Sequence, residues 1–561
     1  MSNARRIASI AAVAATLSVS GAIPSRAAPA ASPAAMGSPR DGAACRASEG
    51  DLAAALGFAM HLCPDVPVAA SSSAPSVDSP AVDATADSTS CLPTTFDRCE
   101  AWVSTPYDGA VKGIDRVGNM MDSDNSMAIT PDGTTLFTAG STDRVGPRYD
   151  QGPIATIAVD ATTGSRLWAT RHDGPDEHPF GSVQSVVASN SAVFVTGYTF
   201  GGDNDLGIGM ALAYDARTGA PRWEADYPGV ALDSAISPDG SLLFVVGEQH
   251  VVDAEGAEQV LATTVAYDTA TGEPVWTRSL SDPAAMPLVG WRVATAPGTV
   301  TVMAGRIDDG YTVGVVVATY ADSGSGAGGT ISKITIPVVH GNIPGGLVLN
   351  ADGSRAFIVQ DQMGSTESAY TAAFDTVSGT MIWTAAYAGD DVVSSAIPWF
   401  FHPIDVSPSG DTVYVATLVD SYIYGEGIAA VAYRARDGQK LWSHTQPVGT
   451  SRCVASCGPL LSVNPKTGQV VVAGAGYLGV RQQATTWSYA PDGTLQWMRR
   501  AATLPSGASV QVDRATESAW TSIVHGPDGR RVYVGGSAWA IFNDPDSSED
   551  VVVSAFDSAM S

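Results

Sequence analysis

Apolar residues along this chain come in short runs that are separated by turns rich in Asp, Gly and Pro. Runs of this kind, bounded by turn residues, predict β-strands. The clearest runs share the pattern Ala-x-Asp-x-x-Thr-Gly-x-x-x-Trp, at residues 158–168, 213–223 and 266–276. Each copy predicts a strand, a tight turn whose Gly supplies the positive φ, and a second strand. The pattern therefore indicates an all-β protein assembled from hairpins.

Further copies of this hairpin end at Trp383, Trp442 and, more loosely, Trp497. In every copy the Trp follows the turn Gly by four residues. Its ring can then lie flat between neighbouring sheets, where its area stabilises their stacking. We predict seven docking tryptophans: Trp102, Trp168, Trp223, Trp276, Trp383, Trp442 and Trp497.

A second hairpin with a Pro/Asp/Gly turn alternates with the first. Its six clear copies begin at Ile129, Ile236, Leu349, Val406, Val463 and His525, and two weaker copies begin at Val187 and Ala294. Two hairpins make four strands in roughly 50–65 residues, which is the size of one blade of a β-propeller.

Eight copies of the second hairpin require eight copies of the first. A seventh copy, from Thr319, keeps the strand–turn–strand outline and lacks the Trp. The eighth is divided between the chain ends, because residues 551–557 form a strand without a following partner and residues 101–109 one without a preceding partner. Their pairing closes the ring and hides the sheet edges. We therefore predict an eight-bladed β-propeller of four-stranded antiparallel blades; a β-sandwich or an open solenoid, the alternatives, leave the complementary ends unexplained.

The Trp-ending pattern resembles the docking motif of pyrroloquinoline-quinone (PQQ) propellers, a quinoprotein-type repeat family with secreted bacterial members. The resemblance covers about residues 93–561 and implies the fold. The family includes quinone dehydrogenases and also members without a cofactor, among them an outer-membrane assembly scaffold. A resemblance to the dehydrogenases would imply adjacent cysteines, a Glu/Asn/Asp set that holds Ca²⁺ and an Asp that acts as a base. This chain has no Cys-Cys pair and no match to that set or to the base. The resemblance therefore assigns no catalytic residue and disfavours PQQ as a cofactor.

The N-terminal part predicts export. Residues 1–28 combine a positive start, an apolar stretch and small residues near Ala28, which is typical of a signal peptide. An uncleaved membrane anchor is the alternative. Residues 29–92 are rich in Ala, Ser and Pro and predict a linker, with one short helix clipped by cysteines, before a propeller at 93–561. We expect a secreted, extracellular protein with no membrane span after cleavage.

Six cysteines predict disulfides in an exported chain. Sequence neighbours suggest three pairs, although six cysteines allow fifteen pairings. A zinc site is the alternative, and no Cys-x-x-Cys pair supports it. The suggested pairs are Cys45–Cys63, Cys91–Cys99 and Cys453–Cys457.

The formal charge of −27 over 561 residues argues against nucleic acid, whose phosphates are bound by Lys and Arg. Acidic residues recur in segments before the third strand of a blade, Glu255 and Glu258 among them, and after the docking strand. Such segments open on one face of a propeller, where they predict a negative ring; solvated surface acids are the alternative. The candidate binding residues are Asp173, Asp176, Glu177, His178, Asp203, Asp205, Asp308, Asp309, Asp390 and Asp391.

One acidic run is a candidate calcium site. Asp544, Asp546, Ser548 and Asp550 alternate along the chain and offer the oxygen ligands that Ca²⁺ prefers. The run lacks the Gly and the distal Glu of an EF-hand loop, so a solvated acidic loop is the alternative. Loop histidines such as His178 are more often exposed side chains than metal ligands or acid–base groups.

Two functions remain open at this point. The first is a non-catalytic binding or scaffold propeller outside the cell, a monomer that engages a protein, glycan or cell-wall partner through its loop face. The second is a PQQ- or metal-dependent oxidoreductase, or a hydrolase, with its site at the central channel. The absence of any matched catalytic set favours the first.

Overall fold

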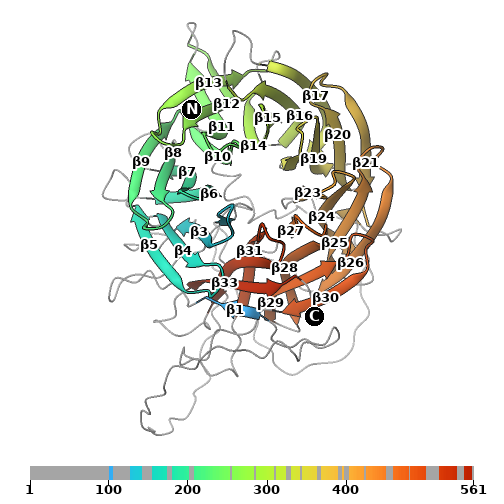
Figure 1. Cartoon of the computed structure of the whole chain (residues 1–561). Helices are drawn as coiled ribbons and strands as arrows, with labels where there is room; N and C mark the ends of the chain where they lie inside the picture. Colours follow the sequence, from blue (N-terminus) through green and yellow to red (C-terminus); the bar gives the residue numbers. More distant parts are fainter. Residues whose placement is uncertain are drawn as a thin grey trace, which may run out of the picture.

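The computed structural model describes eighteen segments of the chain between residues 100 and 558. They are residues 100–104, 127–141, 154–172, 180–200, 207–252, 256–282, 286–308, 311–323, 330–341, 344–362, 368–389, 395–396, 403–421, 425–449, 459–478, 481–500, 517–539 and 549–558. Within them, 33 strands and no helix form eight antiparallel sheets. The sheets stand around a ring, which confirms the predicted eight-bladed propeller (Figure 1).

Each of the first four blades takes four successive strands, from the inner to the outer edge of the ring. They are β2 (Met127–Ile129), β3 (Thr135–Ser141), β4 (Ile154–Asp160) and β5 (Arg166–His172); β6 (Phe180–Ala188), β7 (Ala192–Phe200), β8 (Ile208–Asp215) and β9 (Pro221–Tyr227); β10 (Val230–Ile236), β11 (Leu242–Val252), β12 (Glu258–Asp268) and β13 (Pro274–Leu280); and β14 (Leu288–Ala296), β15 (Thr299–Asp308), β16 (Tyr311–Ala321) and β17 (Thr330–Gly341).

The last four blades include one with a divided inner strand and one built from both ends of the chain. They are β18 (Pro344–Leu349), β19 (Arg355–Gln362), β20 (Ser368–Asp375) and β21 (Met381–Tyr387); β22 (Ser395–Ala396), β23 (Ile404–Val406), β24 (Thr412–Ser421), β25 (Gly425–Arg434) and β26 (Lys440–Gly449); β27 (Leu460–Val463), β28 (Val470–Leu478), β29 (Arg481–Tyr489) and β30 (Leu495–Arg500); and β31 (Glu517–His525), β32 (Arg531–Trp539), β33 (Glu549–Asp557) and β1 (Glu100–Val103). In the sixth blade, β22 and β23 both pair with β24.

The ring closes through the chain ends, as the divided repeat predicts. Strand β1 pairs antiparallel with β33, and Trp102 lies opposite Ala555. Figure 1 shows the blue strand β1 beside the red strands of the last blade. The pairing gives β33 a neighbour on both sides, so the eighth blade is complete.

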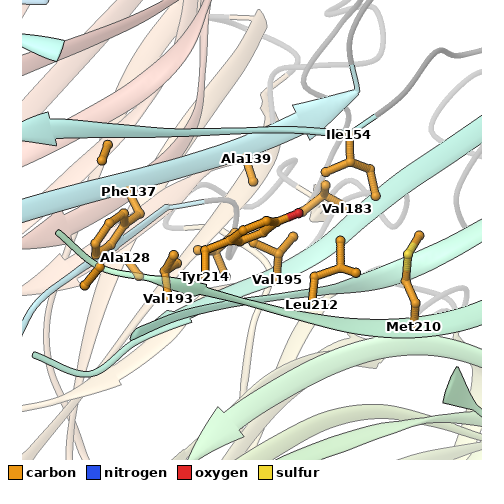
Figure 2. Close-up of a cluster of buried hydrophobic side chains, with 13 residues drawn as sticks. Ala128, Phe137, Ala139, Ile154, Val183, Val193, Val195, Met210, Leu212 and Tyr214 are labelled. Atoms are coloured by element: carbon orange, nitrogen blue, oxygen red, sulfur yellow. The ribbon is translucent and has the colours of Figure 1, made fainter. Parts of the chain in front are cut away.

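The core consists of side chains that pack between neighbouring blades. The third strand of the first blade is buried along nearly its whole length, whereas the outer strand β9 alternates between exposed and covered residues. Central strands are covered on both faces by adjacent sheets, and this explains their continuous apolar sequence. Between the first two blades, Phe137 and Ile154 pack with Val195, Leu212 and Tyr214 (Figure 2).

Six docking tryptophans share one contact. Each indole Nε1–H donates a hydrogen bond to a main-chain carbonyl in the turn of the next blade, at 2.7–3.2 Å. The turn Gly lies against the ring; a Cβ atom at Gly219, whose φ is +71°, would stand 2.6 Å from Trp168. A side chain at this position therefore collides with the indole. The donors and acceptors are Trp102 and Ala161, Trp168 and Ala216, Trp223 and Thr269, Trp276 and Asp322, Trp383 and Ala435, and Trp442 and Pro491. Trp497 is buried against Phe556, with ring centroids 6.0 Å apart.

The fourth blade replaces the tryptophan by Ser332. This residue lies opposite Thr319 of β16, the position that Trp276 takes opposite Ala266 in the third blade. Its hydroxyl donates to the carbonyl of Thr376 in the next turn, and a Cβ atom at Gly379 would stand 3.1 Å from its Cβ atom. The fifth blade thus approaches the strand directly, and a smaller donor provides the docking hydrogen bond.

Connections alternate between the two ends of the ring because neighbouring strands run antiparallel. We call the end with the Pro/Asp/Gly and Thr/Gly turns the turn face. We call the opposite end, where a blade's second strand joins its third and where one blade joins the next, the hairpin face.

In the second and third blades the inner strand has a β-bulge near the hairpin face and lies close against the second strand. A Cβ atom at Gly247 would lie 1.9 Å from the carbonyl oxygen of Val230, so glycine is required there.

Candidate functional site

The predicted acidic residues belong to segments whose flanking strands end at the hairpin face. Asp308 ends β15 and is exposed there, and Asp550 lies near the start of β33, opposite Ala538. The other candidates lie outside the described residues: Asp173, Asp176, Glu177, His178, Asp203, Asp205, Asp309, Asp390, Asp391, Asp544, Asp546 and Ser548. The same holds for Cys45, Cys63, Cys91, Cys99, Cys453 and Cys457. The negative ring, the calcium loop and the disulfides stay predictions.

A histidine lies between two glutamates at the hairpin face of the third blade. His250 and Glu248 point to the same side of β11, and Glu258 begins the paired strand β12. Nε2 of His250 lies 3.6 Å from Oε1 of Glu248, and Nδ1 lies 3.3 Å from Oε1 of Glu258. The close contact with the Glu248 carboxylate, together with the negative charge of Glu258, outweighs burial and raises the pKa of His250 above its usual range. The three side chains form a compact polar cluster, which we call the His250 cluster.

Glu248 is the most deeply buried member of the His250 cluster, with a side chain only 2% exposed. Burial raises the pKa of both Tyr198 and Tyr227, and the charge of Glu248 raises it further. Tyr227 donates its hydroxyl hydrogen to the carbonyl of Thr263 at 2.7 Å. Both phenols therefore stay neutral, and His250 provides the positive charge closest to Glu248 in the cluster.

A second ionic contact lies in the next blade. Arg306 follows Gly305 on β15 as Glu248 follows Gly247 on β11. Its Nε lies 2.5 Å from Oδ2 of Asp282, and its Nη2 donates to Oδ1 at 3.2 Å. The ion pair ties β15 to the connection that leaves the third blade. The same end of blades two to four holds an apolar cluster of Tyr198, Val230, Leu232, Val260, Val289, Trp291 and Ile307.

Two aspartates on inner strands link neighbouring blades. Oδ2 of Asp233 accepts the N–H of Val293 at 2.9 Å, and Oδ2 of Asp405 accepts that of Val463 at 2.9 Å. The Oδ1 atom of each accepts the N–H of the following residue. Burial raises the pKa of Asp405 to about 6 against the opposing effect of these hydrogen bonds. Both carboxylates are thus engaged by the main chain.

One buried histidine is neutral. Nδ1 of His525 lies 2.8 Å from Oγ of Ser462 on the inner strand of the preceding blade. Burial lowers the pKa of His525 to about 3, so the ring is neutral near pH 7 and too weakly basic to be an efficient general base. The pair is a structural link between blades rather than a nucleophile with its base.

The described residues do not fit a calcium-dependent quinone centre. Among them no three His, Cys, Asp or Glu side chains are arranged to hold a metal ion. Both oxygens of the inner-strand carboxylates Asp233 and Asp405 already accept main-chain N–H groups. We therefore derive no step through PQQ or Ca²⁺.

Sequence reasoning pointed to Glu258 and missed its partners. Glu248 comes directly after Gly247 at the end of an apolar run, and His250 follows two residues later on the same face. A charged residue in a strand that is buried on both faces is a signal for a paired, functional or structural ion. Recognising the cluster also requires the register of β11 with β12.

A family model matches residues 154–326, which span most of the first four blades. Its description is "Outer membrane protein assembly factor BamB", and its repeats are of the PQQ type. The chain is a propeller of PQQ-like repeats. The match confirms, over residues 154–326, the resemblance that the docking motif indicates.

Three solved structures match this chain at 12–13% identity and with TM-scores below 0.5. The Dos1 propeller matches with a TM-score of 0.48 at 12% identity, over 79% of this chain and 95% of that one. A europium-containing methanol dehydrogenase gives 0.46 at 12%, over 81% and 92%. The quinohemoprotein alcohol dehydrogenase from Comamonas testosteroni gives 0.43 at 13%, over 82% and 76%. No curated protein matches this PQQ-like propeller. Across its described residues, no helix has the length and apolar character of a membrane span.

Proposed function

We propose that this PQQ-like propeller is a non-catalytic scaffold that binds a protein partner through its hairpin face, outside the cell. The family model that matches residues 154–326 describes an assembly factor, which supports a protein-binding role for these repeats. The signal-like residues 1–28 support an exported location.

One observation carries the proposal. Within the matched region, two large apolar side chains are exposed at the hairpin face of adjacent blades: Ile208 at 46% and Val252 at 70%. The His250 cluster and the exposed Asp308 lie at the same face. Protein interfaces commonly combine apolar contact residues with a polar rim, and these positions have that composition.

Site-directed photo-crosslinking tests the proposal. A photoreactive phenylalanine analogue replaces Val252 at the hairpin face or Val377 in the turn between β20 and β21 at the turn face. The two residues are matched, because both are valines and they are 70% and 69% exposed. In the producing cells we expect one defined protein adduct at Val252 and none at Val377. Equal adducts at both positions, or none at Val252, would contradict binding through this face.

A further inference from the structure

We propose that the His250 cluster is a pH-sensitive clasp that holds the β11–β12 hairpin in place when His250 is protonated. The inference goes beyond partner binding and concerns the stability of the hairpin itself. The three residues of the clasp all belong to the third blade, so it can be tested without a partner.

The geometry favours the doubly protonated ring. A neutral imidazole has one N–H donor and one nitrogen lone pair, whereas the imidazolium has two donors. In this structure both ring nitrogens face carboxylates, Nε2 toward Glu248 and Nδ1 toward Glu258. Only the protonated ring presents hydrogen to both. A neutral ring turns a lone pair toward one of the two negative charges.

Burial makes the loss of that proton costly. The side chain of Glu248 is only 2% exposed, and its Oε2 atom is buried without a hydrogen-bond partner among the described residues. A buried carboxylate without a counter-charge is strongly disfavoured. When His250 loses its proton, the buried carboxylate of Glu248 loses its positive partner. The ionic contact within the hairpin is then removed.

Outside the hairpin, two of the described groups on which the charge of Glu248 acts are uncharged. Tyr198 on β7 and Tyr227 on β9 face it as neutral phenols. Glu258 on β12 adds a second negative charge, at 28% exposure. Arg306 in the next blade is paired with Asp282. The charge state of His250 therefore decides the electrostatic balance of the cluster.

The sign of the pH dependence follows from the raised pKa of His250. A group whose pKa is higher in the folded state stabilises that state fully below its unfolded pKa of about 6.5, and the stabilisation is lost as pH rises through the folded pKa. The clasp is therefore closed in mildly acidic surroundings and loosens in alkaline ones. Opening is local, because the rest of the β11–β12 ladder extends through buried residues toward the turn face.

His172 is a matched control. It also lies at the hairpin face, with Nε2 3.7 Å from Oε1 of Glu224, but that carboxylate is 55% exposed. Among the described residues His172 contacts this one carboxylate, whereas His250 contacts two. Solvent screens such a pair, so replacing His172 should leave the β11–β12 hairpin unchanged.

Amide hydrogen exchange of the full chain tests the clasp. Protection of residues 249–261 is compared at pH 5.5 and 8.5, after correction for intrinsic exchange rates, with the β15–β16 hairpin as internal reference. Between pH 5.5 and 8.5 we expect protection of the wild-type hairpin to fall. The fall should be roughly tenfold for each unit by which the folded-state pKa of His250 exceeds its unfolded value. His250→Gln should abolish this pH dependence, and His172→Gln should retain it. Protection that follows the reference hairpin at both pH values, or a pH dependence that survives His250→Gln, would overturn the proposal.

A direct titration keeps the test valid if a variant folds poorly. Histidine-selective ¹³C labelling of the wild-type chain reports the pKa of each imidazole by NMR. We expect the signal of His250, assigned by its loss in His250→Gln, to titrate above about 6.5. Glu258→Gln should lower that value. A His250 that titrates at or below about 6.5 in the wild type would show that no clasp exists.

Discussion

The docking tryptophans should be the main links between blades, and Trp383 offers the sharpest test. Its side chain is 7% exposed and packs between Phe357 and Tyr433, with both ring-centroid distances at 6.1 Å. Its Nε1–H donates to the carbonyl of Ala435 at 2.7 Å. The ring therefore contributes both buried area and one buried hydrogen bond.

The magnitude follows from these two contributions. A buried Trp removes roughly 200 Å² from water, which at about 25 cal/mol per Å² corresponds to about 5 kcal/mol as an upper value. The residual structure of unfolded chains lowers this figure, so we expect Trp383→Ala to reduce the free energy of unfolding by about 3–5 kcal/mol. Trp383→Phe retains most of the area and leaves the carbonyl of Ala435 unpaired, at a cost of about 1–3 kcal/mol.

Urea-induced unfolding followed by circular dichroism measures both differences. Ile382→Ala is the control, because Ile382 precedes the tryptophan on β21 and is 37% exposed; we expect a loss below about 1 kcal/mol. A loss below about 1 kcal/mol for Trp383→Ala would refute the docking role. Equal losses for Trp383→Phe and Trp383→Ala would show that the hydrogen bond, and not the area, stabilises the seam.

Three further substitutions test other seams. Ser332→Trp should destabilise the protein by about 1–3 kcal/mol in urea unfolding, because the turn of Gly379 already lies on the Ser332 backbone; a stabilised variant would contradict this packing. Gly247→Ala should cost about 3 kcal/mol by the same assay, since its Cβ atom would stand 1.9 Å from the carbonyl oxygen of Val230, and a neutral effect would count against the bulge. The pKa of the half-buried Asp405 is raised to about 6 in the folded state, so its protonated form stabilises the fold. This contribution to the free energy of unfolding should be largest below about pH 4 and should fall by about 2 kcal/mol as pH rises to about 6. The difference in unfolding free energy between wild type and Asp405→Asn should thus be larger at pH 4.5 than at pH 7, and a difference independent of pH would exclude this titration.

The fold could be predicted because each repeat carries its own local signals. Gly164, for example, adopts a φ of +75° in the turn where the pattern requires a residue free of a side chain. The divided eighth blade was predictable because Trp102 and the strand at 551–557 are halves of one motif. Repetition makes such signals reinforce each other along the chain.

The features specific to this chain depend on register and packing, which one sequence does not display. The eroded seventh hairpin did not reveal that Ser332 supplies the docking hydrogen bond, since that requires the position of Thr376 in the next blade. The division of the sixth inner strand into β22 and β23 follows from pairing with β24 and has no local signal. His250 and Glu258 lie eight residues apart, and only the hairpin register brings them together.

The central functional claim is that these PQQ-like repeats serve binding and not quinone chemistry. The most direct measurement is a titration of the purified protein with PQQ and Ca²⁺, followed by absorbance and by substrate-dependent dye reduction. We predict no saturable change in the PQQ spectrum and no dye reduction above the protein-free control. Stoichiometric binding with turnover would contradict the claim and place a redox centre in the propeller.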